Sequence, residues 1–293
     1  MANRNVGVPK QLTDRLPARI SGGHSPVVPV VRLHGMIASG AAGLGRQLLN
    51  SDSVEGALER AFTADGAQAV ALAINSPGGS PTQSQLIGAR IRQLAREHEL
   101  PVIAFCEDVA ASGGYWLACA ADEIVATPTS LLGSVGVVSS GFGLEGLISK
   151  LGVERRLHTA GTNKARLDPF SPEKDDDVQW LLGMQSDIHE EFGAWVRERR
   201  GDKLRGTDDE LFTGEVWIGR KAVELGLADR LGTMREVLAE RYPDAELQVV
   251  HARKSLAARL GLPAAGASGG LPEAAVALVG ALEQRAIWAR FGL

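Results

Sequence analysis

Cysteine is scarce in this chain of 293 residues, which has only two, and no apolar run approaches the 18 residues that a membrane-spanning helix requires. Cys106 and Cys119 both lie in apolar stretches, so we expect two buried thiols rather than a disulfide framework. No group of His and Cys residues has the spacing of metal ligands. The sequence therefore predicts neither a disulfide-stabilised scaffold nor a metal centre.

An excess of positive charge is also missing, since the formal net charge is −4, and this argues against nucleic-acid binding. The first nine residues lack the apolar core of a signal peptide, so we expect a cytoplasmic protein. A hydrophobic content of 44% and a charged content of 23% are ordinary for a globular chain of one large domain or two modest ones.

Composition divides the chain into three parts. Residues 1–25 are polar, contain Pro and Gly, and are predicted to form a flexible arm. Residues 26–251 are predicted to form the folded domain, and residues 252–293 a linker followed by an amphipathic helix. We expect this helix, within residues 272–291, to dock on its own protein or on a second copy. A peripheral contact with the inner face of the membrane is the alternative.

Within the domain, short apolar runs alternate with segments of helical character. The runs are continuous rather than alternating, which predicts strands buried on both faces of a mainly parallel sheet. The expected strands are residues 27–33, 69–74, 102–106, 124–126, 135–139 and 248–251. The expected helices are residues 53–64, 82–98, 113–121, 144–151, 172–199 and 217–225. This alternation predicts an α/β fold.

Ser112 lies between an apolar run and a helical segment, in the frame Asp108-Val-Ala-Ala-Ser112-Gly-Gly-Tyr115. A serine at the start of a helix is commonly an N-cap. The same position suits a nucleophile, because unpaired N–H groups and the helix dipole stabilise an oxyanion there. The frame alone leaves both interpretations open.

Two other segments contain residue types that a serine nucleophile would need beside it: backbone donors to an oxyanion and a general base. Asn75-Ser-Pro-Gly-Gly79 directly follows a strand, so it forms either a simple turn or a donor of backbone N–H groups to an oxyanion. Lys164 lies in a loop, where most lysines are merely solvated. A lysine acts as a general base only when its amine is neutral, a state that burial favours.

Taken together, seven segments resemble the signal peptide peptidase A (protease IV) family, and its short, single-domain, SohB-like branch in particular. They occur in one order, and the match as a whole spans residues 27–231. The segments are Ser-Pro-Gly-Gly, Ala-Ser112-Gly-Gly-Tyr-Trp-Leu-Ala, Ala-Ala-Asp-Glu-Ile-Val-Ala-Thr-Pro, Gly-Ser-Val-Gly-Val, Asn-Lys164, Phe-Thr213-Gly214 and Gly226-Leu-Ala-Asp229. The resemblance implies the fold of Clp protease and crotonase, a spiral of ββα units.

The resemblance also implies a role for each matching residue. Ser112 matches the nucleophile of a Ser/Lys dyad, and Lys164 matches its general base. Gly79 matches an oxyanion-hole donor, Gly113 is a second candidate donor, and Ser134 matches the hydroxyl that orients the lysine. The family uses no cofactor. It cleaves peptides such as signal-peptide remnants next to small or apolar residues, in homo-oligomers whose sites can be shared between subunits.

Three alternatives remain at this point. A histidine, His34 or His158, is a rival base in a Ser-His-Asp arrangement. A crotonase-like enzyme would use the same oxyanion hole on acyl-CoA thioesters, although no carboxylate base or adenine pocket accompanies Ser112. A catalytically silent scaffold of a membrane complex is the non-enzymatic alternative.

Overall fold

The computed structural model describes residues 25–40, 48–250 and 285–293. Nearly all of the predicted N-terminal arm and most of the predicted linker and tail helix lie outside the described residues. Residues 285–289, at the end of that predicted helix, are helical.

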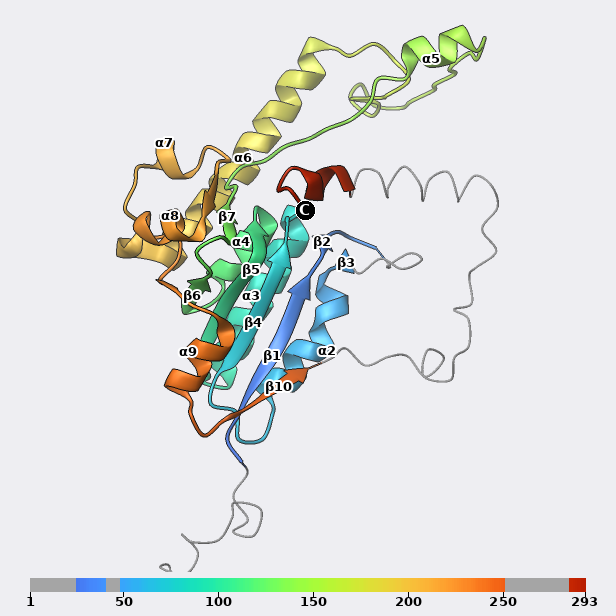
Figure 1. Cartoon of the computed structure of the whole chain (residues 1–293). Coiled ribbons are helices and arrows are strands. Elements are labelled where there is room, and N and C mark those ends of the chain that lie inside the picture. Colours follow the sequence, from blue (N-terminus) through green and yellow to red (C-terminus); the bar gives the residue numbers. More distant parts are fainter. Residues whose placement is uncertain (1–24, 41–47, 251–284) are drawn as a thin grey trace, which may run out of the picture.

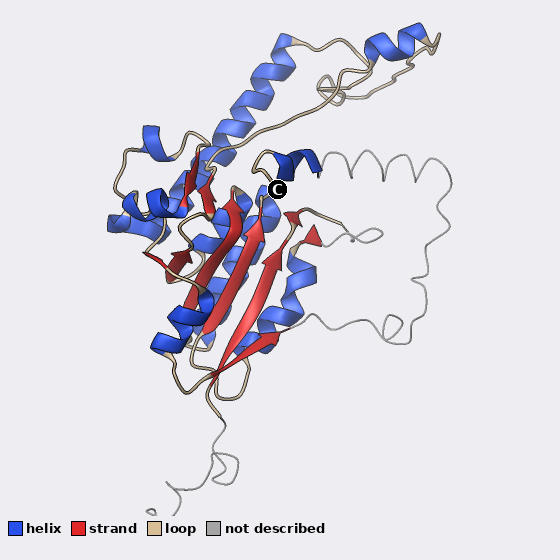
Figure 2. Cartoon of the chain, viewed as in Figure 1, coloured by secondary structure: helices blue, strands red, loops and turns tan. Residues whose placement is uncertain are grey.

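An eight-stranded sheet forms the centre of the domain (Figure 2). Its main path has the order β10-β1-β4-β5-β6-β9, and every pair along this path is parallel. The strands of this path are β1 (Val27–His34), β4 (Val70–Ser76), β5 (Val102–Ala111), β6 (Glu123–Ala126), β9 (Arg230–Leu231) and β10 (Glu246–Val250). The predicted α/β class with a mainly parallel sheet is confirmed.

Both faces of the sheet are buried, as the continuous apolar runs indicated. Leu72 of β4 and Ala104 of β5 face a large core, while their neighbours Ala73 and Phe105 face a second, smaller core. The large core is covered by α2 (Ser51–Phe62), α3 (Pro81–Glu97), α4 (Gly113–Cys119) and the C-terminal half of α6 (Asp175–Arg200). The smaller core is covered by α9 (Met234–Arg241).

Short second strands extend the main strands and complete a ββα repeat. β1 is followed by β2 (Met36–Ile37), which pairs with β3 (Leu48–Leu49) and bridges to Gly79 beyond the end of β4. The first half of β5 pairs with β6, and its second half pairs with β7 (Leu131–Gly133). A helix follows each of β3, β4 and β5. This topology confirms the expected spiral of ββα units.

The sequence predictions around β7 and β8 were wrong. The strand predicted at residues 135–139 is instead β7, because positive φ angles at Gly133 and Ser134 turn the chain directly after it. The helix predicted from residue 217 begins later, as α8 (Gly219–Glu224), because Trp217 lies in β8 (Val216–Ile218), which pairs antiparallel with β7. Such short strands are specified by their tertiary partner rather than by their own sequence. The structure also has a short α7 (Asp208–Leu211).

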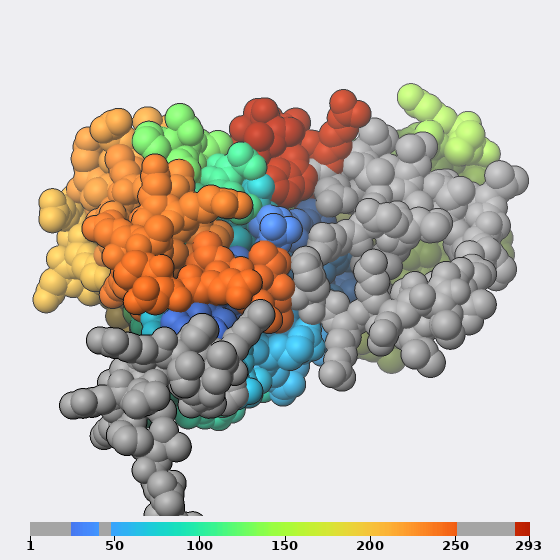
Figure 3. All heavy atoms as spheres, turned by 60° about the horizontal axis from the view of Figure 1, so that its bottom comes forward, coloured from blue at the N-terminus to red at the C-terminus, as the bar shows by residue number. Residues whose placement is uncertain are grey.

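Residues 136–191, which we call the projecting segment, contain no buried residue. The segment includes α5 (Glu145–Lys150) and the N-terminal part of α6, and it extends away from the sheet (Figure 1). In the space-filling view, α5 (light green) lies at the opposite side of the molecule from α8 and α9 (orange; Figure 3). The projecting segment therefore gains little stability from packing against the core of its own chain.

A buried ion pair fixes the C-terminal end of α6. The guanidinium of Arg200, whose side chain is only 2% exposed, donates to both carboxylate oxygens of Asp229 and to the Gly226 carbonyl. Asp229 also accepts from the Ile124 N–H at 2.7 Å. Burial alone would raise the pKa of Asp229, but the hydrogen bonds from Arg200 and Lys203 hold that pKa below its ordinary value.

We predict that Asp229→Ala lowers the free energy of unfolding by about 3–5 kcal/mol, because it leaves the buried Arg200 charge unpaired. Glu240→Ala is the control. It removes the partner of the exposed Arg230 and should cost only a small fraction of that amount. Urea unfolding measures both. Because the pKa of Asp229 is lowered, its contribution is present at neutral pH and is lost as the pH falls through that value. Similar losses in the two variants would contradict this assignment.

Candidate active site

Ser112 joins the end of β5 to the start of α4 in a strained backbone conformation. Its φ of 52° and ψ of −124° are unfavourable for a residue with a Cβ atom. Its N–H donates to the Gly133 carbonyl at 2.8 Å, and its own carbonyl accepts from the N–H groups of Tyr115 and Trp116. The surrounding hydrogen bonds therefore hold a conformation that the isolated chain would avoid.

The side chain of Ser112 does not cap the helix. Ser112 occupies the N-cap position of α4, yet its hydroxyl makes no capping hydrogen bond within that fully described helix. The residue is partly exposed, although Val109–Ala111 before it and the whole of α4 after it are buried. Ser112 is thus in contact with solvent at the end of a buried strand, and the simple N-cap interpretation does not account for its side chain.

The loop after β4 lies directly against Ser112. A Cβ atom built at Gly78 would come within 2.7 Å of both the Ser112 Cβ and the Gly113 nitrogen. Gly79 has a φ of 141°, and a Cβ there would overlap the Ile37 carbonyl oxygen. Only glycine fits these two positions, because the backbone of the loop makes the contact itself.

The N–H groups of Gly79 and Gly113, the predicted oxyanion donors, are not used in the pairing with β2 or within α4, respectively. The Ile37 N–H donates to the Gly78 carbonyl and the Ser80 N–H donates to the Ile37 carbonyl, so the polar groups of Gly79 face away from β2. Gly113 is the first residue of α4, where a backbone N–H has no partner within the helix.

Ser134 lies beside this pair of loops. It follows Gly133, whose carbonyl accepts from Ser112, and its own N–H donates to the Glu215 carbonyl. Ser134 and Ser112 are two of the four non-glycine residues with positive φ in the described chain, the others being Glu99 and Leu167. Strain of this kind gathers at functional sites. The structure thus brings together Gly79, Ser112, Gly113 and Ser134.

Lys164 is not among them. It lies in the projecting segment, exposed to solvent, in a turn in which its N–H donates to the Gly161 carbonyl at 3.2 Å. That turn is tied to α6, because the Arg166 guanidinium contacts Asp177 and lies 5.0 Å from the Trp180 ring centre. The described residues show no contact between Lys164 and Ser112. The assignment of Lys164 as base therefore stays a prediction.

The histidines occupy other positions. His34 Nε2 lies 2.8 Å from Glu107 Oε2, at the bend of β5, and His158 is exposed in the projecting segment. His189 of α6, which the sequence did not single out, has a ring nitrogen 3.2 Å from the carbonyl of Val135, the residue after Ser134. The described residues show no histidine hydrogen-bonded to Ser112.

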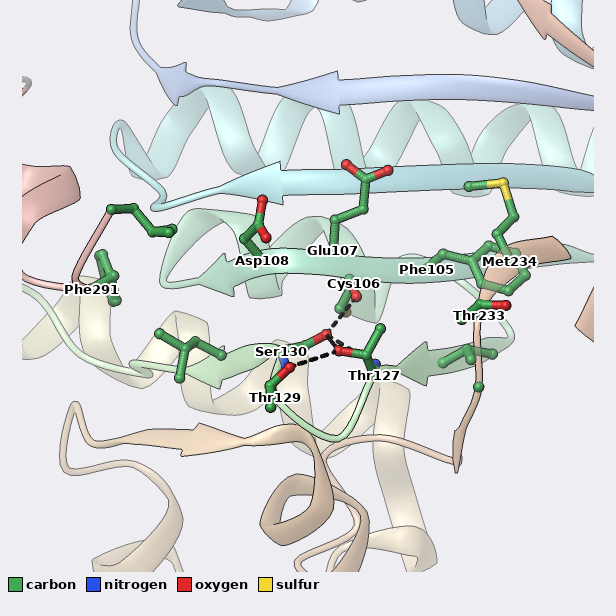
Figure 4. A pocket seen from close by; sticks show the side chains of 14 residues that line it. Phe105, Cys106, Glu107, Asp108, Thr127, Thr129, Ser130, Thr233, Met234 and Phe291 are labelled. Atoms are coloured by element: carbon green, nitrogen blue, oxygen red, sulfur yellow. Dashed lines mark hydrogen bonds between the residues drawn. The ribbon is translucent and has the colours of Figure 1, made fainter. Parts of the chain in front are cut away.

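A cavity of about 450 Å³ opens at the bend of β5 (Figure 4). Thr127, Thr129 and Ser130 contribute hydroxyl groups to its wall, and Phe291 near the C-terminus lies across it. Its lining includes none of the predicted site residues. Among the described residues, no group of three or more His, Cys, Asp or Glu side chains is placed to hold a metal ion. Nor does any helix of the described residues have the length and apolarity to cross a membrane.

Fold and site together define an α/β protein in which a strained, partly exposed serine lies against the Gly78-Gly79 loop. The family model "Peptidase family S49" matches residues 94–248, just over half of the chain. The chain belongs to this family, which confirms the resemblance to signal peptide peptidase A and protease IV. The matched range contains Ser112, Ser134 and Lys164 but not Gly79.

The printed names of two relatives agree with the family model. "Protease 4" of Haemophilus influenzae is 31% identical over 230 residues, which are 76% of this chain and 36% of that protein. "Probable protease SohB" of Buchnera aphidicola is 30% identical over 190 residues, 64% of this chain and 55% of that protein. A Brucella abortus protein named "Na(+)/H(+) antiporter NhaA" is 49% identical over 274 residues, 91% of this chain and 37% of that protein.

The chain thus spans from about a third to just over half of the length of these three relatives. The antiporter name describes a protein of which this chain matches the smaller part. It is not carried over to this chain, because the family model and the two protease relatives agree on a peptidase.

The strain at Ser112 should be measurable as a difference in the free energy of unfolding between two variants. We predict that Ser112→Gly is more stable than Ser112→Ala by about 1 kcal/mol, because glycine adopts positive φ without the penalty that a Cβ atom brings. Both variants lack the hydroxyl, so the comparison isolates the backbone. Urea unfolding of the two proteins measures the difference, and an alanine variant as stable as the glycine variant would show that the turn stores no strain.

Proposed function

We propose that this chain is a serine endopeptidase with a Ser112/Lys164 dyad. The observation that carries the proposal is the conformation of Ser112. This residue is partly exposed and strained, its hydroxyl does not cap α4, and the Gly78-Gly79 loop packs against it. A nucleophile needs an accessible hydroxyl, and acyl transfer needs N–H donors beside it. Membership of peptidase family S49 supports the same chemistry.

In this mechanism the Ser112 hydroxyl attacks the carbonyl carbon of the scissile peptide bond. Lys164 accepts the hydroxyl proton and later returns it to the leaving amine. The N–H groups of Gly79 and Gly113 bind the oxyanion of the tetrahedral intermediate, and the Ser134 hydroxyl orients the lysine amine. Water then hydrolyses the acyl-enzyme by the same route in reverse. The reaction needs no cofactor.

We further propose that Lys164 acts on the Ser112 of a neighbouring copy in a homo-oligomer. The projecting segment exposes large apolar side chains, among them Phe142 at 71%, Leu151 at 69% and Leu182 at 51%. Apolar side chains concentrated on one unburied segment are typical of an interaction surface. Docking of that surface on a second copy would also bury Lys164, as a base requires.

The substrates that this site suits are peptides with small or apolar residues near the scissile bond, including signal-peptide remnants, as the family resemblance implies. We assign the peptidase chemistry to residues 26–251. Residues 252–293 are proposed to serve assembly.

Single substitutions test the dyad. Ser112→Ala and Lys164→Ala should each lower kcat on an unstructured protein such as casein by a factor on the order of 10⁴ or more, because each removes a group that acts in the transition state. His34→Ala, His158→Ala and His189→Ala are the controls and should retain turnover. Loss of activity in a histidine variant, with full activity in Lys164→Ala, would replace the dyad with a histidine-based mechanism.

Mixing experiments test whether the site is shared. If Lys164 serves a neighbouring copy, co-assembly of equal amounts of Ser112→Ala and Lys164→Ala chains should restore about a quarter of wild-type activity, because both intact groups then meet at one site in four. Each variant assembled alone is the control. No recovery from mixed oligomers, verified by light scattering and tagged subunits, would place both groups of a site in one chain.

A further inference from the structure

The pairing of β4 with β5 shifts register immediately before the two loops of the candidate site. Ile74 pairs with Cys106, but Ser76 pairs with Ala110. One residue of β4, Asn75, therefore stands opposite three residues of β5, which form a bulge at Glu107 and Asp108. β5 continues through the bulge to Ala111, so the bulge lies inside the strand rather than at its end.

The side chain of Asn75 fills this bulge. Its Nδ2 donates to Asp108 Oδ2 at 2.6 Å, and its Oδ1 accepts from the Val109 N–H at 3.3 Å. Its main-chain carbonyl accepts from the Gly35 N–H on the opposite side. Figure 4 shows the Asp108 carboxylate directed from β5 toward β4. A single amide thus replaces the backbone hydrogen bonds that the bulge interrupts.

The bulge lies close in sequence to both loops of the candidate site. Asn75 is four residues before Gly79, and Asp108 is four residues before Ser112. Both connections are short and buried, apart from Gly79 and Ser112 themselves. A shift of one residue along a strand moves the backbone by about 3.3 Å and reverses the faces of its side chains. The bulge therefore sets how far Ser112 lies along the sheet relative to the Gly79 N–H.

We propose that Asn75, acting through Asp108 and the Val109 N–H, is a positioning residue that sets the register of the oxyanion loop against the nucleophile. The proposal rests on the serine peptidase function proposed above. Asn75 touches neither the hydroxyl of Ser112 nor the N–H groups of the oxyanion hole in this arrangement. An amide suits the task, because one side chain must donate to a carboxylate and accept from a backbone N–H.

Asn75→Asp tests the donor half of this amide. The variant has nearly the same shape and keeps an acceptor for the Val109 N–H, but it sets a second carboxylate against Asp108. We expect kcat at pH 8 to fall about 10- to 100-fold with KM changed less than about threefold, because a misplacement of about 1 Å costs that much. The ratio of variant to wild-type kcat should rise as the pH falls, since two adjacent carboxylates readily share a proton.

The exchange Asn75→Asp with Asp108→Asn is the rescue. It restores one amide and one carboxylate across the bulge and retains an acceptor for Val109, so kcat should return to within about threefold of wild type. Glu107→Gln is the matched control, because Glu107 lies in the same bulge but pairs with His34 rather than with Asn75. It should leave kcat and its pH profile unchanged.

Four results separate the possible failures. If peptide turnover by the wild-type chain does not depend on Ser112, the peptidase proposal fails, and this one with it. If turnover depends on Ser112 but Asn75→Asp has wild-type kcat at every pH, the positioning role is refuted. It is equally refuted if the exchange variant folds, by urea unfolding, without recovering kcat. The positioning role is also refuted if the loss of kcat in Asn75→Asp is no larger than the loss of folded protein in that variant.

Discussion

The hydrogen bond from the Ser112 N–H to the Gly133 carbonyl is the constraint on which the candidate site depends. It continues the β5–β7 pairing by one step beyond Ala111, and it holds Ser112 at positive φ as the chain enters α4. Strain of this size, about 1–3 kcal/mol, persists only where the surroundings over-determine the backbone. The fully buried α4 supplies that condition, because it cannot shift to relieve the turn.

Segments remote in sequence hold α4 in place. The Tyr115 hydroxyl donates to the Leu227 carbonyl at 2.8 Å, and Trp195 and Arg199 of α6 donate to the Trp116 and Cys119 carbonyls. The Gly226-Leu-Ala-Asp229 segment, which contributes to the family resemblance, therefore has a structural role. It anchors Tyr115 directly, and it anchors the end of α6 through the pair of Arg200 and Asp229.

The sequence predicted most of the central fold because the strands of a buried parallel sheet are continuous apolar runs. β1, β4 and β6 begin and end close to their predicted limits for this reason. β5 was predicted to end at Cys106, since Glu107 and Asp108 are polar, but the strand continues to Ala111. Beyond the bulge β5 pairs with β7, and its Val109 N–H donates to the Asn75 side chain; these are contacts between strands that no single-strand pattern encodes.

The residues of the candidate site likewise divide into four that the structure brings together and one, Lys164, that it does not. Gly79, Ser112, Gly113 and Ser134 were assigned through the resemblance of their short motifs to the family, and the structure brings them together because each motif follows a strand of one sheet. Lys164 differs in kind. Its segment has no buried residue and is held to α6 rather than to the sheet, so the core of a single chain does not bring its amine to Ser112. The apolar side chains around it, Phe142 and Leu151 among them, bury little area within the chain. The proposed docking of this surface on a second copy would bury those side chains and fix the Lys164 amine, which would link the reactivity of Ser112 to assembly.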